Sequence, residues 1–171
     1  MDSLDHGVWR CRYLCRRTKV RVFRSLALPV LLYVCETWTF IRDLRRTLNS
    51  FGTRSLRRIL DNRWSDFLAK KRLLRETQMR FVNCIIRERQ LLLYGHVARF
   101  PDVDPAHQIL SAREPHEWRR PMGQPRASWL QQVDRHLKEM GIGQVCAWGM
   151  ARRRPLEYRR KVDAVMRSSG A

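Results

Sequence analysis

Apolar residues recur every three or four positions along most of the chain, which is the spacing of one face of an α-helix. The strict alternation of apolar and polar residues that is typical of strands is scarce. Glycine and proline are concentrated in a few segments, which mark where helices end. The pattern therefore predicts an all-α fold.

We expect the N-terminal part of the chain to form two helices, over about 3–15 and 19–35, with Thr18 as the N-cap of the second. The second helix has an apolar stripe that we expect to face the core, formed by Val22, Leu26, Val30 and Tyr33. Pro29 lies inside this helix. It predicts a kink, or a break at Leu28, because proline lacks the N–H group and its ring clashes with the preceding turn.

Three further helices are predicted before residue 100, at about 41–60, 69–77 and 81–99. Residues 61–66 are predicted to form a turn. Gly52 lies inside the first of these helices, where glycine costs about 1 kcal/mol relative to alanine. We therefore expect a close helix–helix contact at Gly52.

The chain is predicted to have three parts: a helical bundle at 1–100, a Pro-rich linker at 101–124 and a smaller helical unit at 125–171. The linker also allows a short helix near 106–112. In the last part, Ser128 is the expected N-cap of the first helix. The three predicted helices there cover about 129–140, 144–153 and 155–167.

Charge is the strongest signal of the composition. The 171 residues include 35 basic and 16 acidic residues, which gives a net charge of +19, and only five of the basic residues are lysine. A field of this size attracts polyanions, of which nucleic acid is the usual one, and the guanidinium fork suits phosphate oxygens. GC-rich coding DNA also produces an Arg-rich chain without selection for binding, and that alternative stays open.

Three clusters of basic residues with aromatic neighbours are candidate binding sites for a nucleic-acid backbone. They consist of Arg12, Arg16, Arg17 and Lys19, then Arg54, Arg57 and Arg58, and finally Arg119, Arg120 and Arg126. Trp9 and Tyr13 lie near the first cluster, and the third precedes the helix that begins after Ser128. Trp118 or Trp129 could stack a base, although a Trp at the start of an amphipathic helix is more often part of the core. Each cluster could equally be a solvated helix face.

Residues that could carry catalysis or bind a metal are sparse. Asp102 and Asp104 flank Val103 between two prolines, a pattern typical of a solvated turn. Cys11 and Cys15 lack the second pair of ligands that a zinc site requires. His96 has no carboxylate or nucleophile in register, so we expect a structural histidine. We therefore predict no catalytic residue, no metal and no cofactor.

Four segments, in order, resemble the C-terminal part of reverse transcriptases of LINE-type (non-LTR) retrotransposons. They are LPVLLYVCETW (28–38), FGTRSLRRILDNRW (51–64), RERQLLLYGHVARFP (87–101) and RRPMGQPRASWLQQV (119–133). The chain departs from the family at Val34, where the family usually has a glycine that would allow a close approach. A valine there would crowd such a contact.

The resemblance implies a helical, thumb-like region followed by a C-terminal helical extension, which in the family is thought to grip template and primer. The catalytic palm would lie upstream of such a region. Polymerase chemistry requires carboxylates that hold two metal ions, and the family's Tyr-x-Asp-Asp motif does not occur in this sequence. We therefore expect a protein that is not an enzyme.

The sequence favours a non-catalytic protein that binds RNA or DNA with little sequence preference through its Arg clusters. A helical protein-interaction fragment and a translated relic without a selected function are the alternatives. We expect no membrane partner, since no apolar run is long enough to span a bilayer. We also expect no small-molecule substrate. The first residues resemble no secretory signal and the five cysteines are an odd number, so we expect an intracellular protein, nuclear or cytoplasmic.

Overall fold

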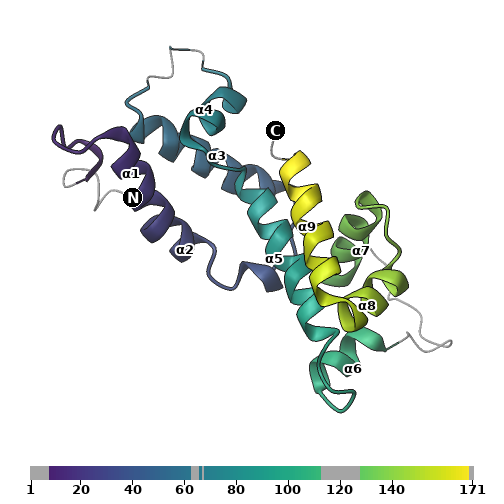
Figure 1. Ribbon diagram of the computed structural model, residues 1–171. Helices are drawn as coiled ribbons and strands as arrows, with labels where there is room; N and C mark the ends of the chain where they lie inside the picture. The colour runs from purple at the N-terminus through teal and green to yellow at the C-terminus, as the bar shows by residue number, and fades with distance from the viewer. Residues whose placement is uncertain (1–7, 63–65, 67, 113–127, 170–171) are drawn as a thin grey trace. The chain divides into compact units, whose positions relative to one another are not determined.

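The computed structural model describes residues 8–62, 66, 68–112 and 128–169. Within these ranges the regular structure is entirely helical, and no strand is present (Figure 1). The prediction of an all-α fold is confirmed.

The chain divides into two compact units. Unit 1 comprises the described residues of Met1–Cys35 and Arg42–Ile86, and unit 2 comprises Glu36–Ile41 and Arg87–Ser169. This division follows packing, whereas the predicted parts with boundaries at 100 and 124 follow the proline content of the sequence. The linker and the three predicted parts therefore stay a prediction.

Unit 1 contains α1 (Arg16–Val22), a π-helical turn (Phe23–Ala27) and α2 (Leu28–Leu31), followed by α3 (Arg42–Ile59) and α4 (Lys70–Thr77) (Figure 1). The bounds of α3 and α4 agree with the predicted helices at 41–60 and 69–77. Large apolar side chains from every one of these segments are buried, including Phe23, Leu28, Leu56 and Leu73.

The N-terminal helix predicted over 3–15 is wrong for the residues that the structure describes there. Residues 8 and 9 form a π-helical turn, and 10–15 are irregular. Arg12 would lie four residues before Arg16 on a continuous helix, where like charges are destabilising. The N-cap of α1 is Cys15 instead of Thr18, and the Thr18 hydroxyl lies 3.2 Å from the Cys15 thiol.

Pro29 is accommodated by a wider helical turn before it. The π-helical turn ends with an N–H bond from Leu28 to the carbonyl of Phe23, five residues earlier. A proline ring clashes with the carbonyl four residues before it, and the wider turn is one way for a helix to continue past that obstacle. The helix therefore continues past Leu28 instead of breaking there. It ends at Leu31, four residues before the predicted end at residue 35.

The extra residue in this turn also changes which side chains face inward. Most of the predicted inner stripe faces solvent: Leu26 is 55% exposed, Val30 79% and Tyr33 77%. The side chains that are buried instead are Val20, Phe23, Leu28 and Leu32. The predicted orientation is wrong because it assumed an uninterrupted period of 3.6 residues.

Gly52 lies at a close contact, as its position inside α3 predicted. A Cβ atom at Gly52 would lie 2.9 Å from the Cγ2 methyl of Val82, which is itself buried. Real Cβ atoms essentially never approach another heavy atom that closely. The missing side chain thus allows α3 to pack against Val82, the first residue of α5 (Val82–Val97).

Helix α5 (Val82–Val97) is shared by the two units: its residues up to Ile86 belong to unit 1, and those from Arg87 belong to unit 2. Unit 2 also contains α6 (Pro105–Ser111), α7 (Trp129–Glu139), α8 (Gln144–Arg153) and α9 (Pro155–Ser169) (Figure 1). The fully buried core of unit 2 draws on α5, α7, α8 and α9, and includes Leu91, Tyr94, Val133, Leu137, Tyr158 and Val162. Trp129 packs against this core, as expected.

The segment Glu36–Ile41 is held in unit 2 by hydrogen bonds to its backbone. Trp129 Nε1 donates to the carbonyl of Glu36 at 2.6 Å, and Gln90 Nε2 donates to that of Trp38 at 2.8 Å. The N–H of Phe40 in turn donates to Gln132 Oε1 at 2.7 Å. Gln90 and Gln132 are buried and also bond to each other, so their polar atoms are satisfied inside the core.

Candidate functional site

A basic groove of about 960 Å³ lies in unit 1 between the irregular residues before α1, α1 itself and the C-terminal half of α3. Seven basic residues line it: Arg10, Arg12, Arg16, Lys19, Arg54, Arg57 and Arg58. Among the described residues that line it, Asp61 is the one acid. The groove thus joins two clusters that lie more than 30 residues apart in the sequence, and we call it the basic groove.

The irregular wall of the groove is anchored by a buried tryptophan. Trp9 is only 3% exposed, and its carbonyl accepts a 2.7 Å hydrogen bond from Lys19 Nζ. The N–H of Cys11 donates to the carbonyl of Val8, and the side chain of Leu14 is half-buried. These contacts hold the irregular residues before α1, so the arginines there are presented from a defined backbone.

The three arginines of α3 share the groove but differ in their contacts. Arg54 and Arg58 are exposed, whereas Arg57 is half-buried and its Nη2 donates to the carbonyl of Leu68 at 3.0 Å. Arg57 therefore holds the segment after α3 in place, and it contributes its charge to the groove mainly through the field. Arg12 and Arg16, on the opposite wall, are exposed and take part in no ion pair with the described residues.

A second groove of about 580 Å³ lies on another side of α1. Arg16 lines both grooves, and Arg17, Arg21 and Arg24 line the second one. Arg24 is engaged in the fold, because its Nη2 donates to the carbonyl of Gln78 at 3.0 Å. The second groove therefore offers fewer open guanidinium groups, and it contains Glu76 as well.

Ten residues were predicted from the sequence as nucleic-acid contacts. The basic groove brings six of them together: Arg12, Arg16, Lys19, Arg54, Arg57 and Arg58. Arg17 lines the second groove instead. The third predicted cluster lies outside the described residues and consists of Arg119, Arg120 and Arg126. The sequence prediction omitted Arg10 from the wall of the groove and Arg21 from the second one, although both lie in the basic run before and within α1.

Cys15 is an exposed thiol on the wall of the basic groove. The hydrogen bond with the Thr18 side chain, and then the bond to the Thr18 backbone, hold the pKa of the Cys15 thiol below its ordinary value of 9.0. Hydrogen bonds to the thiolate favour the charged form, so this cysteine should react faster than an ordinary exposed one.

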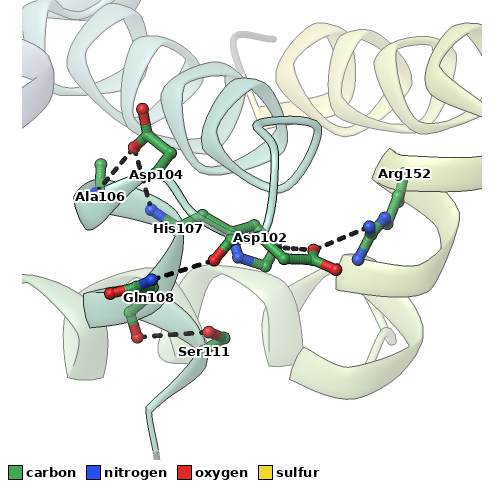
Figure 2. Close-up of polar contacts among 7 residues, drawn as sticks. All are labelled: Asp102, Asp104, Ala106, His107, Gln108, Ser111 and Arg152. Carbon is green, nitrogen blue, oxygen red and sulfur yellow. Dashed lines mark hydrogen bonds and ion pairs between the residues drawn. The ribbon is translucent and has the colours of Figure 1, made fainter.

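A cluster of polar side chains at the turn before α6 is the other candidate in the molecule (Figure 2). Asp104 is the N-cap of α6 and accepts from the N–H groups of Ala106 and His107. Asp102 accepts from Arg152 Nη2 of α8 at 2.8 Å, and its Oδ1 lies 3.7 Å from Nε2 of the buried His107. The hydroxyl of Ser111, also in α6, donates to the carbonyl of Gln108 at 3.2 Å (Figure 2). The cluster fixes the turn and ties it to α8.

No group of three or more His, Cys, Asp or Glu side chains that could hold a metal ion occurs among the described residues. None of the helices, over the ranges described, is long and apolar enough to cross a membrane. Comparisons with protein-family models, with curated proteins and with solved structures found no match. The class of protein is therefore defined by its own features, which are an all-α fold and a basic groove on one compact unit.

Proposed function

We propose that the chain binds the sugar–phosphate backbone of RNA or DNA in the basic groove of unit 1. The observation that carries the proposal is the convergence of seven basic side chains from two distant segments on one concave surface, with a single acid among its described lining residues. A cluster of guanidinium groups attracts phosphate, and its concave shape lets several groups contact one strand.

The proposed binding is tolerant of sequence. The side chains that line the groove are mainly arginines, which contact phosphate oxygens, and phosphate contacts carry no sequence information by themselves. The exposed side chains of Arg12, Arg16 and Arg54 line a shared space, so we expect each to take a phosphate of the same strand. The resemblance to the post-palm region of LINE-type reverse transcriptases supports this proposal and is itself a proposal about origin.

The first test is binding of the full chain to fluorescently labelled 20-nucleotide RNA and DNA of two unrelated sequences, measured by anisotropy. We expect the two sequences to bind within a few-fold of each other. Raising salt from 50 to 200 mM should weaken binding by at least tenfold, because each phosphate contact releases counterions. Absence of binding at 50 mM salt would refute the proposal.

The competing proposal is an acidic protein that contacts unit 1 at the basic groove and at an apolar patch outside it. The exposed apolar residues Leu26, Val30 and Tyr33 on the π-helical turn and the residues after it favour this second candidate. Capture of a protein that survives nuclease treatment, and that is lost when Val30 and Tyr33 are replaced by serine, would support it. Loss of all captured protein after nuclease treatment would favour nucleic acid.

A further inference from the structure

We propose that the basic groove takes a single strand, and that Tyr13 stacks on one of its unpaired bases. This inference rests on the proposed function, and it specifies the class of nucleic acid. Tyr13 is 99% exposed, although its neighbours on both sides, Arg12 and Leu14, line the groove. Tyr13 itself does not line the groove, so its ring lies between two lining residues in the sequence and has its faces open to solvent.

The Tyr13 ring makes no contribution to the packing of the described residues. The two tyrosines of unit 2, Tyr94 and Tyr158, are 1% exposed and bury their rings in the core. Tyr13 has no ring contact and no hydrogen bond with the described residues. Its segment is nevertheless fixed by Trp9 and by the bond from Lys19, so the ring is carried on an anchored piece of backbone.

Tyr13 directly follows Arg12, so the aromatic ring and the guanidinium group leave the backbone at adjacent positions. A strand whose phosphate pairs with Arg12 has a base within reach of the adjacent aromatic ring. Stacking on an exposed aromatic ring needs a base that is splayed out of its helix. A duplex keeps its bases paired and stacked, so it could use the arginines but not Tyr13.

The test compares Tyr13→Ala with the matched control Tyr33→Ala, since Tyr33 is 77% exposed but neither of its sequence neighbours lines the groove. Both variants, the wild type and Tyr13→Phe are titrated with a single strand and with a duplex of the same sequence. We expect Tyr13→Ala to lose about tenfold in affinity for the single strand. Tyr13→Phe, which keeps the ring, and Tyr33→Ala should bind like the wild type.

Stacking also has a signature that charge does not share. Tyr13→Ala should weaken single-strand binding by the same factor at every salt concentration, because no phosphate contact is lost. The wild type should prefer the single strand over the duplex, and Tyr13→Ala should lose this preference.

Two results would overturn the inference while leaving the proposed function intact. One is unchanged single-strand affinity in Tyr13→Ala when Arg12→Gln and Arg54→Gln weaken binding. The other is tighter binding of the duplex by the wild type. Absence of binding to either nucleic acid by the wild type would refute both proposals.

Discussion

Val34 adopts φ 53°, in the left-handed region that favours glycine. A β-branched residue in that region is strained, at a cost of about 1–2 kcal/mol. The resemblance had pointed to a glycine at this position, and the expected reason was a close approach to another segment. Val34 is instead 41% exposed, and the structure supplies a conformational reason, which is the turn of the chain after α2.

We expect Val34→Gly to raise the free energy of unfolding by up to about 1 kcal/mol, because relief of backbone strain exceeds the extra entropy of glycine in the unfolded chain. Val30→Gly is the matched control, since Val30 is exposed but helical. That control should lower the free energy of unfolding by a few tenths of a kcal/mol. Urea denaturation of the three proteins measures both values, and a loss of stability in Val34→Gly would contradict the assignment of strain.

Cys15 should react with iodoacetamide at a lower pH in the wild type than in Thr18→Val. The thiol is exposed, and the Thr18 contact stabilises its thiolate. Peptide mapping after timed alkylation between pH 6.5 and 9.5 measures the midpoint for Cys15 in each protein. Thr18→Val should shift the Cys15 midpoint upward toward 9.0. Equal Cys15 midpoints in the two proteins would show that the contact does not form.

At the scale of elements, the packing of α5 against α9 depends on one glycine. A Cβ atom at Gly95 would lie 2.5 Å from Cε1 of Tyr158, whose ring is buried. The Tyr158 hydroxyl donates to the carbonyl of Leu91 at 2.8 Å, so the ring cannot withdraw without losing that bond. From the sequence, Gly95 is only a residue of low helix propensity inside a helix. The contact with Tyr158 explains why a side chain is absent there.

Gly95→Ala should therefore lower the free energy of unfolding by roughly 2 kcal/mol or more, through overpacking of α5 against Tyr158. Gly149→Ala in α8 is the matched control, because nothing lies within 4 Å of a Cβ atom there. The control should stabilise the protein by up to about 1 kcal/mol through helix propensity alone. Calorimetry or urea denaturation compares them, and the same sign for both variants would contradict the contact at Gly95.

The sequence predicts an element well where a local signal marks its start and an unbroken period marks its length. Ser128 caps α7 in a full capping box with Gln131, and the helix continues to Glu139 as its apolar spacing indicates. The segment before α1 has no such signal. The π-helical turn before Pro29 shifts the period, and no pattern in the residues shows that shift in advance.

At the scale of the whole molecule, the sequence could identify basic clusters but not which of them meet. Arg12 and Arg54 share one groove because the segment before α1 folds beside α3, a tertiary contact that helical spacing does not specify. Arg57 is half-buried and donates to the carbonyl of Leu68, a structural role that the sequence pattern does not indicate. The sequence identified the basic residues, and the tertiary packing determines which of them line the groove.

Alkaline pH should destabilise the protein through the buried tyrosines of unit 2. Burial raises the pKa of Tyr94 to about 12, and it raises that of Tyr158 as well. Unfolded tyrosine ionises near pH ~10, so between about pH 10 and 12 the unfolded chain binds fewer protons than the folded one, and the free energy of unfolding falls as pH rises. The stabilising effect is complete below pH ~10.

Urea denaturation at pH 8 and pH 11 measures this loss. Tyr94→Phe is the control, because phenylalanine keeps the ring but has no ionisable hydroxyl. The wild type should lose more stability between the two pH values than Tyr94→Phe does. An equal loss in the two proteins would show that Tyr94 ionises normally in the folded chain.

The central claim is that nucleic acid binds in the basic groove, and not merely to a chain of net charge +19. The most direct measurement is the salt dependence of single-strand affinity for two triple variants with the same loss of charge. Arg12→Gln, Arg16→Gln and Arg54→Gln change the groove, whereas Arg153→Gln, Arg159→Gln and Arg160→Gln change exposed positions of unit 2. The groove variant should lower the slope of log K against log salt by roughly 2, and the control should leave it nearly unchanged. Equal slopes for the two variants would contradict the claim.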